Sequence, residues 1–196
     1  MHPRQYKNVD FNEHVTFQEM RAEGRLHVVP FTSPVSVQTP PMTLATELCN
    51  EDGERLPFVN VVAPKMFLDF LTSFEEHLVT NSIENRKEWF KKKLDEDAVR
   101  QCYKSFMRPG GVLKLKLTES TQAFDALGKP LRMEDIATES RIRCIVEATR
   151  LSFGKQEFGS VLRVVQMQVL SDPPCMLLDD TATVISYGSD DDDEFL

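Results

Sequence analysis

Hydrophobic and polar positions divide the chain into strand-like segments, a helical region, and a second group of strand-like segments. The first group consists of short β-rich stretches at Leu26–Val29, Val35–Thr39 and Pro57–Val62. Prolines at positions 30, 34, 40 and 41 punctuate these stretches. Because proline cannot donate to a strand ladder, its presence favours a sheet edge or a bend.

The middle of the chain changes to a period of three to four residues, which predicts helices. One apolar face is formed by Met66, Phe67, Phe70, Leu71, Phe74 and Leu78. Pro64 precedes this face at a position that a helix start tolerates. A second helix is predicted over Asp95–Phe106, where three leading acids suit the positive end of the helix dipole. Pro109–Gly111 ends it.

Strand-like segments return after these helices. Val112–Leu117 alternates, with Leu113, Leu115 and Leu117 on one side and the lysines on the other. Arg141–Leu151 alternates at its start, and Ser160–Leu170 is long and mostly apolar. The glycine-containing SFGKQEFGS segment between them predicts a hairpin.

This order predicts a mainly β fold with inserted helices. We expect an OB-fold-like five-stranded barrel with a helix between strands 3 and 4, and an α+β sandwich is the competing architecture. The expected division is an N-terminal extension (1–24), a nucleic-acid-binding domain (25–178) and an acidic flexible tail (179–196). Residues 1–24 show no clear period, and the tail is expected to be disordered apart from a brief strand at Thr183–Tyr187.

Charge is distributed unevenly along the 196 residues, whose formal net charge is −8. Residues 179–196 hold seven acids and no Lys or Arg, so the rest of the chain has 24 acids against 23 bases. Residues 84–116 carry ten bases and five acids. The chain therefore combines a basic central region with an acidic end.

Motifs for catalysis, metal binding and membrane insertion are not found in the sequence. The four cysteines are scattered and the four histidines do not cluster, so we expect reduced thiols, no metal and no cofactor. No hydrolase, zinc-protease or P-loop motif occurs, and we expect no enzyme. Without a leader-like or membrane-length apolar run, we expect a protein of the cytoplasm or nucleus that is not secreted.

The basic region contains the first candidate for nucleic-acid binding. Trp89 and Phe90 lie between Arg86 and Lys87 on one side and Lys91, Lys92 and Lys93 on the other. Single-stranded nucleic acid needs cations for its phosphates and flat rings on which its bases stack. The simpler alternative is that the two rings anchor a loop on the core and that the lysines are only solvated.

Alternating cations on the predicted strands form the second candidate. Lys114 and Lys116 project from the same face, about 7 Å apart by strand geometry. Arg141 and Arg143 repeat the pattern, Arg163 adds a third row, and Phe153 and Lys155 add a ring and a cation in the hairpin. The alternatives are a merely soluble outer face and hairpin phenylalanines that fold back on the barrel.

The tail is the third candidate. Its final acids, Asp190, Asp191, Asp192, Asp193 and Glu194, are followed by Phe195 and Leu196. Such a segment can compete with nucleic acid for the protein's own cations, or it can be captured by a partner with a basic, apolar pocket. A tail that only improves solubility would not need an apolar end.

Several stretches together resemble a known family. They are VQTPPMTL (Val37–Leu44), WFKKKL (Trp89–Leu94), LKLKL (Leu113–Leu117) and the strand pair of Arg141–Val169. The chain is similar in these stretches to the single-stranded-DNA-binding proteins of short-tailed bacteriophages and their relatives in large nucleocytoplasmic DNA viruses. By resemblance, Asp190–Phe195 would contact replication partners and shield the DNA site. The chain departs from the family in its short acidic block and its final leucine.

These observations predict a viral-type protein that coats single-stranded DNA without sequence preference in replication, recombination and repair. The expected partners are single-stranded DNA and, through the tail, replication proteins such as a polymerase or a helicase–primase. A homodimer is left open. The alternatives are a virion or structural interaction protein and an RNA-binding OB module.

Overall fold

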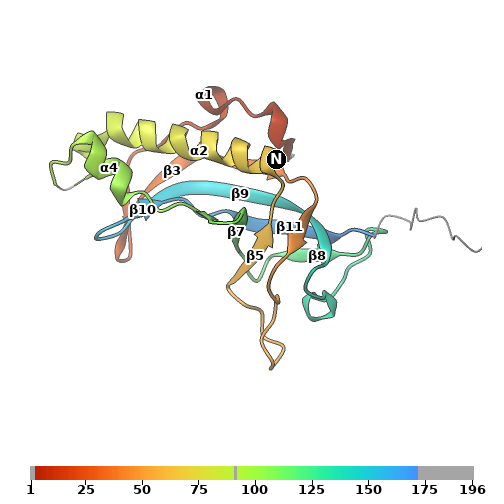
Figure 1. Ribbon diagram of the computed structural model, residues 1–196. Coiled ribbons are helices and arrows are strands. Elements are labelled where there is room, and N and C mark those ends of the chain that lie inside the picture. Colours follow the sequence, from red (N-terminus) through yellow and green to blue (C-terminus); the bar gives the residue numbers. More distant parts are fainter. Residues whose placement is uncertain (1–2, 91, 172–196) are drawn as a thin grey trace, which may run out of the picture.

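The protein is mainly β, and a computed structural model describes residues 3–90 and 92–171 (Figure 1). The strands are β1 (Arg4–Gln5), β2 (Arg21–Glu23), β3 (Leu26–Gln38), β4 (Met42–Leu44), β5 (Phe58–Val62), β6 (Met107–Arg108), β7 (Val112–Lys116), β8 (Gln122–Phe124), β9 (Arg141–Phe153), β10 (Phe158–Gly159) and β11 (Arg163–Val169). The helices are α1 (Phe11–His14), α2 (Lys65–Glu84), α3 (Arg86–Trp89) and α4 (Glu96–Cys102), with 3-10 turns at Tyr6–Asn8 and Met133–Asp135. None of the helices in this part of the chain combines the length and apolarity needed to span a bilayer.

Five strands close into a barrel. β9 pairs with β4 along one edge and with β11 along the other, and β5 and β7 complete the ring between β4 and β11. β7 and β11 are parallel, with Arg163 opposite Lys116, whereas the other pairs of the ring are antiparallel. A barrel of five strands is the architecture of the OB fold. The predicted mainly β, OB-like fold is therefore confirmed.

β3 and β4 follow the same edge of β9 and behave as one bent strand. They are separated by Thr39 and two prolines, which lack the N–H that a ladder needs. Thr39 bridges this gap, because its N–H donates to the carbonyl of Cys144 at 2.8 Å and its Oγ1 accepts from the N–H of Cys144 at 3.0 Å. β3 itself continues past Pro30 and Pro34, where its register against β9 shifts.

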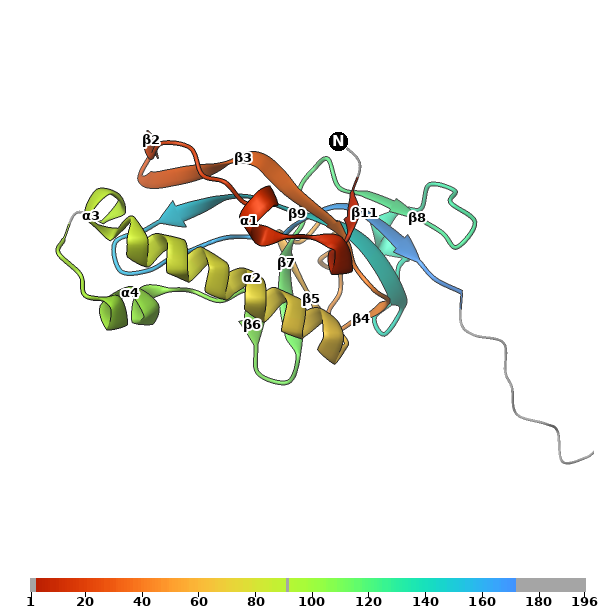
Figure 2. The same cartoon turned by 90° about the horizontal axis from the view of Figure 1, so that it is seen from above.

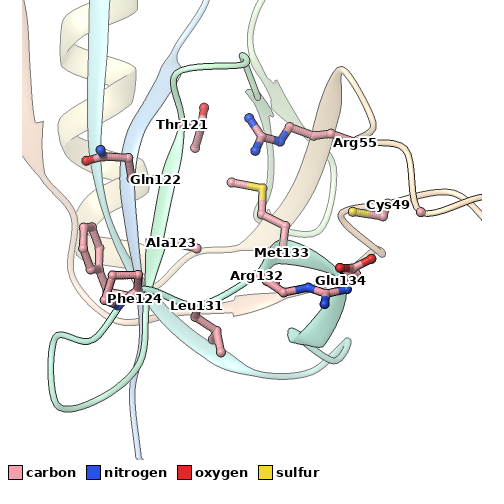
Figure 3. A pocket seen from close by; sticks show the side chains of 12 residues that line it. Cys49, Arg55, Thr121, Gln122, Ala123, Phe124, Leu131, Arg132, Met133 and Glu134 are labelled. Carbon is pink, nitrogen blue, oxygen red and sulfur yellow. Dashed lines mark ion pairs between the residues drawn. The ribbon is translucent and has the colours of Figure 1, made fainter.

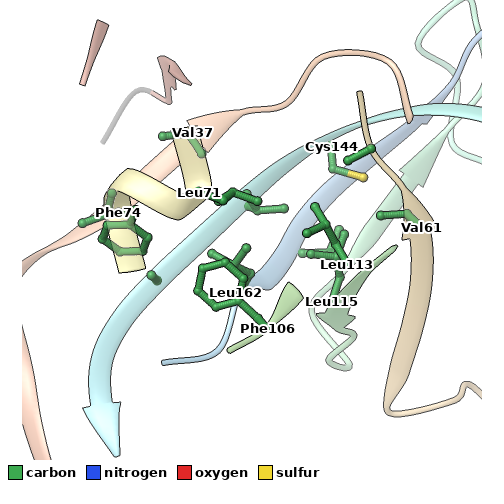
Figure 4. Packing of buried hydrophobic residues seen from close by; sticks show 14 of the residues in the cluster. Val37, Val61, Leu71, Phe74, Phe106, Leu113, Leu115, Cys144 and Leu162 are labelled. Carbon is green, nitrogen blue, oxygen red and sulfur yellow. The ribbon is translucent and has the colours of Figure 1, made fainter. Parts of the chain in front are cut away.

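α2 supplies one side of the core. Phe67, Leu71, Phe74 and Leu78 recur at the predicted spacing and are all buried. Figure 4 shows Leu71 and Phe74 directed into the cluster of buried side chains that also contains Leu113 of β7. The leucines of the alternating VLKLKL segment thus face the core, and this leaves its lysines on the outer surface of the barrel.

α2, α3 and α4 lie in the chain between β5 and β6, and β6 is followed directly by β7. Within the ring these helices join the second strand to the third, because β3 and β4 count as one, whereas the prediction placed a helix between strands 3 and 4. α4 ends at Cys102, before the predicted end at Phe106. The chain leaves the helix there because Tyr103 bridges to Phe158 and the N–H of Lys104 donates to the carbonyl of Phe158 at 2.8 Å.

The N-terminal segment is ordered against α2, although its sequence shows no clear period. Figure 1 shows α1 on the side of α2 that faces away from β9. The ring of Tyr6 packs edge-on against Phe67 at 5.2 Å, and Phe11 stacks on Phe74 at 5.4 Å. α2 is therefore held between the barrel and this segment. The acidic tail and the predicted strand at Thr183–Tyr187 lie outside the described residues.

Candidate nucleic-acid interface

The outer surface of β5 and β7 carries an aromatic ring next to two lysines. Phe58 of β5 is opposite Lys116 of β7, and Asn60 is opposite Lys114. The Nζ of Lys114 lies 4.1 Å from the centroid of the Phe58 ring, which is a cation–π contact. We call Phe58, Lys114 and Lys116 the β5–β7 face.

Phe58 is a candidate that the sequence pattern alone did not predict. Its side chain is 36% exposed, whereas its neighbour Val59 is buried. The signal was present in PFVNVV, where Val59 and Val61 face inward and Phe58, Asn60 and Val62 face outward. An exposed ring is available for base stacking, and ammonium groups beside it are available for phosphate. The β5–β7 face therefore has both parts of a single-strand site.

β11 places Arg163 beside this face. Arg163 is opposite Lys116 on one side and opposite Glu147 of β9 on the other. Its Nη2 donates to the Oε2 of Glu147 at 2.7 Å, and the Glu147 side chain is only 17% exposed. Its Nε is buried with no hydrogen-bond partner among the described residues. Arg163 thus reaches the same surface, but much of its charge is already balanced.

Arg141 and Arg143 lie elsewhere on the barrel. Both point outward, because Ile142 and Cys144 between and after them are buried. Arg141 is opposite Thr43 of β4, and Thr43 is in turn opposite Val62 of β5. Arg143 is opposite Gln168 of β11, on the other edge of β9. Neither arginine forms an ion pair with another described residue, and the same holds for Lys114 and Lys116. The four cations share the outer surface without forming a single row.

The rings predicted near the basic segment are packed against one another. Trp89 is 8% exposed and contacts Phe17 and Phe153, with ring centroids 5.3 and 6.0 Å apart. Phe153 is 7% exposed and stacks on Phe158 at 5.3 Å. Phe90 is half-buried and meets both phenylalanines edge-on. These rings have core partners, as in the simpler alternative, and only Phe90 retains appreciable exposure.

The cations around these rings belong to α3, to the segment after it and to the β9–β10 hairpin. Figure 2 shows α3 at one end of the molecule, away from β8, and we call this the α3 end. Lys87, Lys92, Lys93 and Lys155 are exposed. Arg86 is half-buried and donates to the carbonyl of Ile83 at 2.7 Å. Lys91 lies outside the described residues. The structure therefore separates the predicted residues into this α3 group and the cations of the barrel.

Glu75 of α2 contacts the chain segment that lies between the α3 group and the barrel cations. Its buried carboxylate accepts from the Oγ of Ser105 at 3.0 Å and from the N–H of Phe106 at 3.1 Å. Burial raises the pKa of Glu75, and burial with the nearby carboxylate raises the pKa of Tyr103. The carbonyl of Phe106 in turn accepts from the N–H of Lys114 at 3.1 Å. Glu75 thus fixes the segment between α4 and β6, which contacts Phe158 of β10 and, through Phe106, Lys114 of β7.

A cavity of about 450 Å³ lies between the loop before β5 and the loop after β8 (Figure 3). Two arginines line it, and both are already engaged. Arg55 donates to the carbonyl of Thr118, and Arg132 pairs with Glu134 and Asp135. No group of three or more potential metal ligands occurs among residues 3–90 and 92–171. This cavity therefore offers an anion less free charge than the β5–β7 face.

Solved structures with a similar fold are phage single-stranded-DNA-binding proteins. The protein from bacteriophage Enc34 superposes with a TM-score of 0.50 at 9% identity, covering 88% of this chain and 99% of that one. The Enc34 protein in complex with single-stranded DNA gives 0.50 at 10% identity, covering 82% and 97%. Bacteriophage T7 gp2.5 gives 0.47 at 10% identity, covering 74% and 98%. The two Enc34 superpositions confirm the predicted resemblance to the phage proteins for the fold.

The family is defined by sequence. A family model described as a family of unknown function, DUF5871, matches residues 58–180, and the chain belongs to this family. The match begins at Phe58 and includes β5, β7, β9 and β11. No curated protein matches the sequence.

Proposed function

We propose that this protein binds single-stranded DNA on the outer surface of its barrel, without sequence preference. The observation that carries the proposal is the exposed ring of Phe58 beneath the ammonium of Lys114, with Lys116 in register beside it. OB folds bind oligonucleotides on the face of their second and third strands, and β5 and β7 are those strands in this ring.

The chemistry of the face supports a single strand. Bases of a single strand are free to stack on a ring, and each such contact contributes about 1–3 kcal/mol. Lys114, Lys116, Arg141 and Arg143 lack acidic partners among the described residues, so phosphates can bind them and release counterions. Phosphate contacts and stacking carry no sequence information, which accounts for the absence of a sequence preference.

Two further considerations favour DNA and a role in its metabolism. One of the structures with this fold was solved in complex with single-stranded DNA. We infer a coating role in replication, recombination and repair, in which Asp190–Phe195 would contact replication proteins and compete with DNA for the barrel cations. The acidity of residues 179–196 supports this part of the proposal.

Titration of matched single-stranded DNA, double-stranded DNA and RNA oligonucleotides at low and high salt tests the proposal. We expect the single-stranded DNA to bind most tightly and its affinity to fall steeply with salt. Absence of single-strand binding at low salt would contradict the proposal, and preferential binding of RNA would assign the face to RNA instead.

The tail is tested separately with a chain that ends at Leu178. If the acidic end competes with DNA, the shortened chain binds single strands more tightly than the full chain. Equal affinities would remove the shielding role and leave the binding face intact.

A further inference from the structure

A second hollow lies on a different part of the barrel surface from the β5–β7 face, where β8, β9 and β11 meet. It has a volume of about 350 Å³ and is lined by Gln38, Phe124, Arg143, Gln166 and Gln168 among others. Strand pairing explains why these residues meet, because Phe124 of β8 is opposite Gln168 of β11, which is opposite Arg143 of β9. Figure 3 shows Phe124 and Gln122 on one side of β8, away from Arg55 and Met133.

β11 connects this hollow to the β5–β7 face. It pairs with Lys116 at Arg163 and with Phe124 at Gln168, so one strand passes from one region to the other. Five residues of strand span about 16 Å, which is roughly the length of two to three nucleotides of an extended chain. Gln122 and Gln166 are opposite each other between the two ends. A single strand of nucleic acid can therefore follow β11 from one end to the other.

The groups in the hollow suit a nucleotide. Phe124 is a half-buried ring, and Arg143 has no acidic partner among the described residues. The Nε2 of Gln166 donates to the Oε1 of Gln122 at 3.2 Å, which leaves the Oε1 of Gln166 and the Nε2 of Gln122 without a partner in the same part of the chain. Amide groups can pair with the edges of bases, rings can stack them, and a guanidinium can bind phosphate.

We infer that this hollow is a second nucleotide-binding point for the strand held by the β5–β7 face. Phe124 stacks one base, the amides of Gln122 and Gln166 contact base edges along the path, and Arg143 binds the phosphate beside Phe124. This inference rests on the proposed function and adds a direction to it: the nucleic acid runs along β11, and the site includes β8 and β9.

The test compares Phe124→Ala and Arg143→Gln with the unchanged protein, using oligothymidylates of two and eight nucleotides. The short oligonucleotide is shorter than the path and reaches only one end of it, whereas the long one reaches both. We expect each variant to weaken binding of the eight-nucleotide strand at least about fivefold and to change that of the two-nucleotide strand much less. Leu127→Ala, at an 81% exposed position in the loop after β8, is the matched control and should have no effect.

Abasic positions supply the second measurement. An eight-nucleotide strand with one base removed at the position that meets Phe124 should bind the unchanged protein more weakly, and Phe124→Ala should not weaken it further. If the unchanged protein binds the short and the long oligothymidylate, and neither variant changes the ratio of the two affinities, this inference is wrong and the proposed function stands. If the unchanged protein binds no single strand, the proposed function itself fails.

Discussion

The α3 end and the β5–β7 face both combine aromatic rings with cations, but they use their rings differently. At the α3 end, Trp89, Phe153 and Phe158 are buried against one another. On the β5–β7 face, the ring of Phe58 is exposed and a lysine lies over it. A dense local group of rings and cations is therefore a weaker indicator of a binding surface than strand alternation, because alternation determines which side chains point outward.

The largest expected effect is a loss of folding stability when a buried ring at the α3 end is removed. Phe158→Ala removes a ring that is 2% exposed and that contacts Phe90, Phe153 and Tyr103. Such truncations cost about 3–5 kcal/mol, so we expect a correspondingly lower free energy of unfolding in urea. Affinity for DNA, measured on the folded fraction, should be unchanged. A stable Phe158→Ala variant that loses DNA binding would instead place these rings in the interface.

The next largest expected effect is a loss of affinity for single-stranded DNA when the exposed ring of the β5–β7 face is removed. Phe58→Ala removes the exposed ring, and a lost stacking contact weakens binding by about 1–3 kcal/mol, or roughly 5- to 150-fold. The melting temperature should change little. Val62→Ala is the matched control, because Val62 is also exposed on β5 but carries no aromatic ring. Equal losses of affinity in the two variants would show that the ring has no specific role.

Salt dependence separates the two groups of lysines. Replacing Lys114 and Lys116 together with glutamine should lower the slope of log affinity against log salt by roughly 1.4, since each phosphate contact on a single strand contributes about 0.7. Replacing Lys92 and Lys93 in the same way should change the slope less if the barrel is the interface. A larger change from the second pair would move the binding path to the α3 end.

The sequence predicted the fold more completely than it predicted the site. Alternation in VLKLKL and the period of the Phe67–Leu78 face directly reflect burial, and both segments fold as expected. The role of Trp89 could not be obtained in this way, because its partner Phe17 is distant in the chain and lies in a segment without a clear period. Phe58 was missed because a single outward ring in a strand resembles a core residue until its register is known.

Replacing Glu147 should change the affinity for single-stranded DNA less than the substitutions above, and it should raise this affinity. Its carboxylate pairs with Arg163 at 2.7 Å beside Lys116, and it opposes any phosphate that approaches this part of the barrel. Glu147→Gln keeps the shape of the side chain and frees the charge of Arg163. We expect affinity for single-stranded DNA to rise a few-fold at low salt and the difference to shrink at high salt. Unchanged or weaker binding would show that Arg163 does not face the nucleic acid.

The smallest expected effect is a pH-dependent change in stability caused by Glu75, a buried residue that lies between the α3 end and the β5–β7 face. Burial raises its pKa in the folded protein above the unfolded value, although the hydrogen bonds from Ser105 and Phe106 act in the other direction. A raised folded pKa gives stability that is fully present below the unfolded pKa and is lost as the pH rises through the folded pKa.

Urea unfolding of Glu75→Gln between about pH 4 and pH 7 measures this contribution. The variant cannot titrate at this position, so the unchanged protein should lose stability relative to the variant as the pH rises. DNA affinity of the folded variant should remain the same, because Glu75 contacts the segment before β7 and not its outer surface. A constant stability difference would mean that Ser105 and Phe106 fully offset the burial of the carboxylate. A change in DNA affinity would show that the two regions are coupled through this segment.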